Sequence, residues 1–137
     1  MTIFVDTSMF YASVDRDDRS NARAKAVLGA GEDLLTSDHI LVETWLLLRT
    51  RLNRAVAERF WDGVRAGGAT VEPVTIADLE QAWAIGDAFP DQDFSIVDRT
   101  SFALMQRLGV LRAAALDDDF AIFRFGRDRS RAFEVIR

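Results

Sequence analysis

The chain has 137 residues, of which 49% are hydrophobic, and its formal net charge at pH 7 is −5. This length is typical of one domain, and the hydrophobic fraction is large enough to build a buried core. The absence of cysteine excludes a disulfide framework, a thiolate metal site and a cysteine nucleophile, so any metal must be held by oxygen ligands or by His39. No apolar run reaches the about 20 residues of a membrane span, and the N-terminus does not resemble a signal peptide, so we expect a cytoplasmic protein with no membrane partner.

The first half of the chain alternates between strand-like and helix-like segments. A β-rich run predicts a strand over residues 2–5, and apolar residues at helical spacing predict a helix over 20–28. A second short strand is expected over 34–36. A long helix capped by Ser37 or Asp38 follows to Leu52, and a further apolar stripe predicts a helix over 54–66.

The second half continues the alternation. A strand is expected over 70–74, interrupted by Pro73, and Thr75 then caps a helix that Pro90 closes. In this helix Ile76, Leu79, Ala82, Trp83 and Phe89 recur at helical spacing, and we interpret such stripes as core. After an acidic loop, a helix is expected over 95–108, a buried strand over 113–116 and a last strand over 132–136.

This alternation with short connections predicts an α/β fold, in which a central, mainly parallel sheet is covered by helices on both faces. We find no repeat, linker or low-complexity segment, so residues 1–137 are predicted to form a single domain.

Acidic residues follow two of the predicted strands. Asp6 comes directly after the first strand and Asp117 directly after the strand over 113–116. In parallel sheets, ligands gather beyond the carboxyl ends of the strands, so both side chains should face that crevice. Taken alone, the segment from Asp6 to Ser8 is more typical of a helix N-cap than of a ligand site.

Two more acids lie where a lone carboxylate is costly. Glu43 is surrounded at helical spacing by Ile40, Leu46 and Leu47, so it is predicted to avoid the solvated face. A structural ion pair with an arginine is the alternative. Asp98 begins a helix, where Ser95 and Asp98 also fit a purely structural capping box. Four carboxylates from different elements at one sheet edge would repel one another without a cation, and this convergence favours a divalent metal site.

Two other enzyme classes with acids at strand ends fit less well. A response-regulator receiver domain needs paired early acids and a late lysine, whereas the only lysine is Lys25. A haloacid-dehalogenase-type phosphatase needs Asp-x-Asp after the first strand, but Ser8 occupies the second position.

Four segments in this order resemble a PIN domain of the VapC-type toxins over nearly the whole chain: Ile3 to Ser8, Val42 to Thr44, Asp93 to Ala103 and Ala115 to Phe120. The resemblance implies a three-layer α/β/α, Rossmann-like fold and an Mg²⁺-dependent endoribonuclease toxin, with Mn²⁺ as a substitute, that cleaves structured RNA such as tRNA or rRNA. It also implies a cognate VapB-type antitoxin. The alternative is a catalytically degenerate PIN-like module that binds RNA or protein without cutting.

Carried over to this sequence, the catalytic and metal-binding acids would be Asp6, Glu43, Asp98 and Asp117. Asp6 and Asp98 would be the main ligands, Glu43 a ligand or the group that orients the attacking water, and Asp117 a ligand of a second cation. Relatives often have a basic residue or histidine before the closing phenylalanine, where this chain has Asp118 and Asp119, which makes Asp119 a possible additional ligand. Thr7 and Ser95 are expected to orient the carboxylates.

The net negative charge argues against a polyanionic partner unless basic residues are clustered. The sequence has two such clusters, one with Arg16, Arg19, Arg23 and Lys25 and the other with Arg49, Arg51 and Arg54. We expect the second cluster to bind RNA, although a solvated helix face is the alternative for both. We also expect a homodimer formed through helical surfaces. The antitoxin is expected to insert a basic residue near Asp6 and Asp98.

Overall fold

Five parallel strands form the centre of the molecule, in the order β3-β2-β1-β4-β5. The computed structural model describes residues 1–137. The strands are β1 (Thr2–Val5), β2 (Asp33–Ser37), β3 (Thr70–Glu72), β4 (Arg112–Ala114) and β5 (Glu134–Ile136). The helices are α1 (Thr7–Val14), α2 (Asn21–Leu28), α3 (Asp38–Arg51), α4 (Arg54–Gly63), α5 (Ile76–Ala88), α6 (Ile96–Leu108) and α7 (Asp119–Ile122), with a π-helical turn, η1 (Val64–Gly68), after α4.

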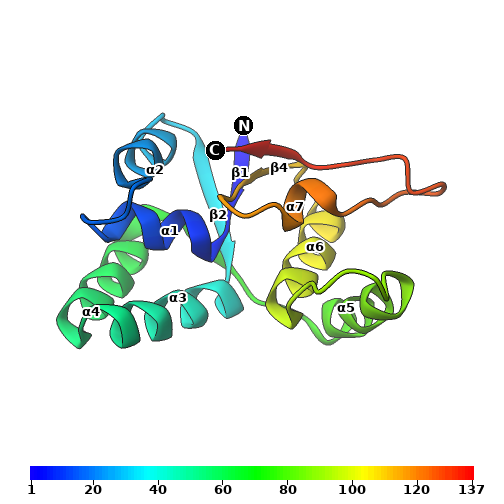
Figure 1. Ribbon diagram of the computed structural model, residues 1–137, viewed down its shortest axis with the longest axis horizontal. Coiled ribbons are helices and arrows are strands. Elements are labelled where there is room, and N and C mark those ends of the chain that lie inside the picture. Colours follow the sequence, from blue (N-terminus) through cyan, green and yellow to red (C-terminus); the bar gives the residue numbers. More distant parts are fainter.

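The helices cover both faces of the sheet. Figure 1 shows α1 to α4 on one side and α5 to α7 on the other. The predicted α/β fold with a parallel sheet and two helical layers is therefore confirmed. No helix is both long and apolar enough to cross a bilayer.

The order of the strands creates a crevice between β1 and β4. From β1 the chain winds outward through β2 to β3, and it then crosses back to place β4 on the other side of β1. The connections after β1 and β4 therefore leave in opposite directions, which makes the gap between the ends of these two strands a topological switch point. Ligands of open α/β sheets bind at such points.

The core is built from the central strands and a group of phenylalanines. Phe4 of β1 is fully buried and stacks on Phe120 of α7, with 6.3 Å between ring centroids. Phe102 of α6 packs edge-on against Phe120 at 5.0 Å and stacks on Phe123 at 4.4 Å. These contacts pack α7 against β1 and α6 against α7.

Two expectations about packing and boundaries need correction. The apolar stripe of α5 is not core throughout, because Ile76 and Trp83 are 75% and 67% exposed and Leu79 is also exposed. Ala82 of the predicted stripe is buried and Phe89 packs against the core, as does Ile85, which the stripe did not include. The third strand ends at Glu72, before Pro73, which has no N–H to donate to a neighbouring strand.

Candidate active site

Asp6 stands at the carboxyl end of β1. Its backbone N–H donates to Ala114 O at 3.0 Å, which continues the pairing with β4, and its side chain begins α1 as the N-cap. Asp6 Oδ2 accepts hydrogen bonds from the Ser8 hydroxyl at 2.7 Å and from the Ser8 N–H at 3.2 Å. Burial raises the pKa of Asp6, the bonds from Ser8 oppose that rise, and the charge of Glu43 adds to it. The residue is thus both a helix cap and a buried acid.

Asp117 follows β4 and lies at the same edge, because β1 and β4 are parallel neighbours. The Ser8 hydroxyl accepts a hydrogen bond from Leu116 N–H at 2.9 Å, which holds the segment before Asp117 against the start of α1. Partial desolvation and the negative charges of Asp6 and Asp119 raise the pKa of Asp117 to about 7.

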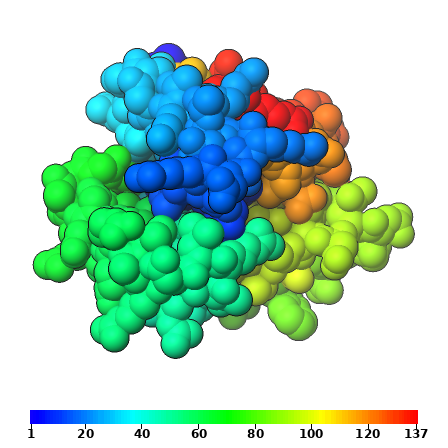
Figure 2. Space-filling model, turned by 60° about the vertical axis from the view of Figure 1, so that its left-hand side comes forward, coloured from blue at the N-terminus to red at the C-terminus, as the bar shows by residue number.

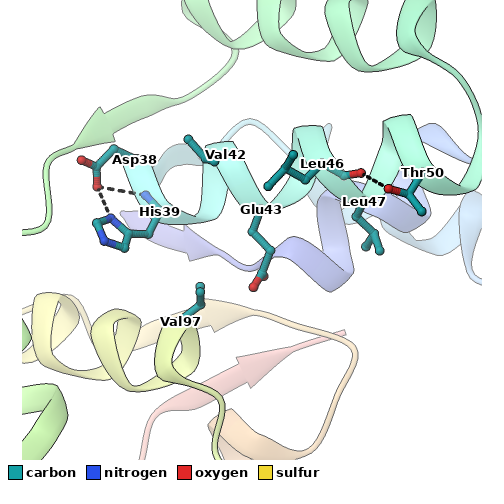
Figure 3. A pocket seen from close by; sticks show the side chains of 8 residues that line it. All are labelled: Asp38, His39, Val42, Glu43, Leu46, Leu47, Thr50 and Val97. Atoms are coloured by element: carbon teal, nitrogen blue, oxygen red, sulfur yellow. Dashed lines mark hydrogen bonds and ion pairs between the residues drawn. The ribbon is translucent and has the colours of Figure 1, made fainter.

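Glu43 reaches the site from the middle of α3. Figure 3 shows its side chain pointing away from the helix axis toward Val97 at the start of α6. Glu43 Oε1 accepts a hydrogen bond of 2.6 Å from the Thr7 hydroxyl, and Thr44 in turn donates to Thr7 at 3.3 Å. No arginine or lysine forms an ion pair with Glu43 within 4.0 Å, so the structural ion pair considered as its alternative role is absent.

Asp98 is the buried acid of α6. Ser95 caps this helix by accepting a hydrogen bond from Asp98 N–H at 3.0 Å, but the Asp98 carboxyl group does not return the bond to Ser95. Only half of the predicted capping box is formed, so Ser95 orients the Asp98 backbone and not its carboxylate. Burial, a hydrogen bond with Asp119 and the charges of Asp6, Asp117 and Asp119 raise the pKa of Asp98 to about 8.

All four predicted acids, Asp6, Glu43, Asp98 and Asp117, line one cleft of about 480 Å³, which we call the acidic cleft. Its other lining residues include Thr7, Ser8, Tyr11, Arg19, Arg51 and Ser95. The cleft brings together residues that lie up to 111 positions apart in the chain. None of the four carboxylates forms an ion pair, and no three of the His, Asp and Glu side chains stand in an arrangement ready to hold a metal ion.

The neighbouring acids differ in where they point. Asp119 lies near Asp98 and Asp117, and its charge helps to raise the pKa of both residues. Asp118 is exposed and pairs with Arg137 at 2.9 Å, away from the other carboxylates. His39 bonds to Asp38 at 2.9 Å beside the apolar cleft of Figure 3, one turn of α3 before Glu43, and does not reach the acidic cleft.

The three arginines predicted to bind RNA separate in the structure. Arg51 lines the acidic cleft, two turns of α3 beyond Glu43. Arg54 is exposed and pairs with Glu58 at 3.2 Å. Arg49 is exposed and does not line the acidic cleft.

Sequence reasoning missed Ser8 and Arg19 as parts of the site. Ser8 joins the two central strand ends by accepting from Leu116 and donating to Asp6. Its position two residues after a predicted N-cap was the available signal, because a hydroxyl there can bond back to the capping carboxylate. Arg19 belongs to the first basic cluster of the sequence, but its place in the loop between α1 and α2 gave no indication that it lines the cleft.

The sequence and the fold both match known proteins. The family model of the PIN domain matches residues 3–126. Over 130 residues the chain is 39% identical to the 23S rRNA-specific endonuclease VapC20 from two strains of Mycobacterium tuberculosis, and the match covers 90% of this chain and 95% of VapC20. The crystal structure of M. tuberculosis VapC20, described as a sarcin-ricin loop cleaving toxin, has a TM-score of 0.82 and 36% identity, covering 87% of this chain and 92% of that chain.

More distant structures share the fold. VapBC2 from Rickettsia felis, bound to a DNA fragment from its promoter, matches with a TM-score of 0.69 at 8% identity, covering 99% of this chain and 98% of that chain. FitAcB from Neisseria gonorrhoeae matches with a TM-score of 0.61 at 16% identity, covering 86% and 88%. From its sequence and its fold together, the chain belongs to the PIN-domain family and, within that family, to the VapC toxins.

Proposed function

We propose that this chain is an endoribonuclease toxin that cleaves ribosomal RNA, with the sarcin-ricin loop of 23S rRNA as its target. The observation that carries the proposal is the convergence of four unpaired carboxylates from different elements on one cleft. The extent of the match to a 23S rRNA-specific endonuclease supports this substrate over tRNA. All four acid positions are filled, so no observation favours a module that binds RNA without cutting it.

The cleft would use a divalent cation, Mg²⁺ with Mn²⁺ as a substitute. The donor set fits such an ion, because it consists of carboxylate and hydroxyl oxygens, which Mg²⁺ prefers. The raised pKa values of Asp6, Asp98 and Asp117 also fit, since a nearby cation would favour their charged forms. A bound cation supplies activation of water and neutralisation of charge on the phosphoryl oxygens.

The side chains divide the remaining work. We assign Asp6 and Asp98 as the main ligands, since both are buried at the centre of the site. Ser8 holds Asp6 in place, and Asp117 completes the ligand set, with Asp119, which lies near Asp98 and Asp117, as an additional ligand.

Glu43 would orient the attacking water. Thr7 engages Oε1 of Glu43, which leaves Oε2 free to accept a hydrogen bond from that water. The water oxygen forms a new bond to phosphorus and loses a proton to solvent, and the bond from phosphorus to the ribose oxygen breaks. The ribose oxygen takes up a proton from solvent, so the products are a phosphate monoester and a hydroxyl group. Arg51, at the rim of the same cleft, is the arginine we assign to an RNA phosphate.

Two protein partners are proposed. A VapB-type antitoxin is supported by the similarity to VapC toxins, and an arginine from its extended tail would bridge Asp6 and Asp98 in place of the cation. A homodimer is supported by exposed apolar side chains on two helices, α3 and α5. These side chains are Val42, Leu46, Ile76, Leu79 and Trp83.

Residues 1–137 would act as one PIN domain. The family model ends at residue 126, but β5 pairs with β4 in the same sheet, which supports including the last eleven residues. An enzyme that acts on ribosomal RNA would work in the cytoplasm.

Sequencing of RNA 5′ ends after brief induction in cells would test the substrate. We expect new ends at one position in the sarcin-ricin loop of 23S rRNA, and none after induction of the Asp98→Asn variant. New ends confined to tRNA would overturn the proposed substrate, and an absence of new ends in any RNA would overturn the proposed activity.

A further inference from the structure

Exposed arginines without acidic partners lie beside the acidic cleft. Arg16, Arg19, Arg51 and Arg59 form none of the ion pairs of the chain. They come from the loop between α1 and α2, the end of α3 and the middle of α4, so the fold gathers them from separate segments. Figure 2 shows this face, with the blue N-terminal segment set between α2 above it and the green α3 and α4 below.

Arg51 joins two clefts. It lines the acidic cleft together with Arg19, and it also lines a second cleft of about 740 Å³ together with Arg16 and Arg59. We call the second one the arginine cleft; its other lining residues include Asn53 and Phe60. A chain that passes through the acidic cleft can therefore continue into the arginine cleft past Arg51.

Tyr11 and Asp15 lie beside Arg51, where the two clefts meet. The guanidinium carbon of Arg51 lies 5.2 Å from the centroid of the Tyr11 ring, and the Tyr11 hydroxyl donates to Asp15 Oδ2 at 2.7 Å. The other carboxyl oxygen of Asp15 accepts from Asp17 N–H at 3.0 Å. Arg51 forms no ion pair with Asp15 or any other acid, so apart from its contact with Tyr11 its N–H groups remain available to an anion.

The two clefts also differ in charge. Five carboxylates line the acidic cleft, the four acids of the site and Asp18, against two arginines, Arg19 and Arg51. The arginine cleft has three arginines against two aspartates, Asp15 and Asp17. A phosphodiester chain needs a cation only at the bond that is cut, and guanidinium groups suit the phosphates on either side of it.

We propose that the arginine cleft binds the RNA backbone next to the cleaved bond. Arg16 and Arg59 would contact phosphates on one side of that bond, and Arg51 would contact the phosphate where the two clefts meet. This inference rests on the proposed function, since it takes the acidic cleft as the place of cleavage. It adds a binding site for RNA phosphates that is separate from the carboxylates.

Binding is tested in the inactive Asp6→Asn protein with a fluorescein-labelled RNA hairpin that carries the sarcin-ricin loop. The variant pair Arg16→Ala and Arg59→Ala should weaken binding about tenfold and reduce the slope of log K against log salt by about 1.4 to 1.8, the value for two lost phosphate contacts. A matched pair, Lys25→Ala and Arg65→Ala, removes the same charge from exposed positions that line neither cleft and should leave both quantities nearly unchanged. Equal losses in the two pairs, or no loss in the first, would overturn the inference.

Cleavage separates this inference from the function on which it rests. In otherwise wild-type protein, shortening the RNA from one end should slow cleavage, and the Arg16→Ala and Arg59→Ala pair should be insensitive to that shortening. If the wild-type protein cleaves RNA, and the wild-type protein and the Arg16→Ala and Arg59→Ala variant respond equally to shortening, RNA binding by the arginine cleft is ruled out and the proposed function stands. If the wild-type protein cleaves no RNA, the proposed function fails, and the binding measurement still decides whether the cleft holds RNA.

Discussion

Asp78 and Asp98 occupy the same position, the third residue, of two consecutive helices, and only Asp78 has a basic partner. Asp78 completes a capping box with Thr75 and receives two hydrogen bonds of 2.9 Å from Arg107, which together lower its pKa against the effect of burial. Asp98 forms no ion pair, and burial together with the charges of Asp6, Asp117 and Asp119 raises its pKa to about 8. The charge of Asp78 is compensated by Arg107 within the protein, whereas the charge of Asp98 has no such partner and remains available to a bound cation.

The two acids should therefore respond oppositely to neutralisation. Asp78→Asn should lower the free energy of unfolding by about 2 kcal/mol. This is less than the loss expected for a fully buried ion pair, because Arg107 is partly exposed and solvent screens the pair. At about pH 9, where Asp98 is charged, Asp98→Asn should raise the stability of the chelated protein, because it removes a buried like-charge repulsion. Urea unfolding of both variants in EDTA measures this, and destabilisation by Asp98→Asn would contradict the account of its surroundings.

The stability of the metal-free protein should fall as pH rises. The pKa values of Asp98 and Asp117 are raised to about 8 and about 7, so the folded chain binds these protons more tightly than the unfolded chain does. The two carboxyl groups contribute fully to the free energy of unfolding below about pH 4, where they are also protonated in the unfolded chain. This contribution is lost as the pH rises through their pKa values in the folded chain. We expect the Tm in EDTA to drop by at least about 5 °C between about pH 6 and about pH 9, with a smaller drop for Asp98→Asn. A flat profile for the wild-type protein would argue against the raised pKa values.

Thr7 should act as a positioning residue through Glu43. Thr7→Val keeps the shape of the side chain and removes the 2.6 Å hydrogen bond, so kcat should fall by about tenfold while KM changes little. Thr7→Ser retains the hydroxyl and should restore most of the rate. Equal losses in both variants would mean that packing, and not the hydrogen bond, explains the effect.

The acids themselves should differ in their importance. Asp6→Asn, Glu43→Gln and Asp98→Asn should each reduce cleavage by at least about 100-fold without unfolding the protein. Asp118→Asn is the matched control, because its carboxylate is exposed and pairs with Arg137. Single-turnover cleavage and thermal melts on the same samples decide the assignment; near wild-type cleavage by any of the first three variants would remove that residue from the site.

The sequence predicted the parts of the site that depend on local order. Asp6 and Asp117 follow strands, and parallel strands place their carboxyl ends at one edge, so their convergence could be inferred without a structure. The contacts of Ser8 with Leu116 could not, because they link residues 108 positions apart. Arg51 could not be separated from Arg49 and Arg54 either, since the choice depends on which side of α3 meets α1. The exposure of Trp83 was missed because helical spacing does not tell which of two apolar faces is covered.

Cleavage of 23S rRNA by purified protein, with the cation controlled, tests the central claim most directly. The wild-type protein should cut the sarcin-ricin loop at one position, lose this activity in excess EDTA and regain it with Mg²⁺ or Mn²⁺, while Asp98→Asn stays inactive under every condition. Full cleavage in excess EDTA, or cleavage by Asp98→Asn at the wild-type rate, would contradict the claim that the four carboxylates form a metal-dependent site for cutting RNA.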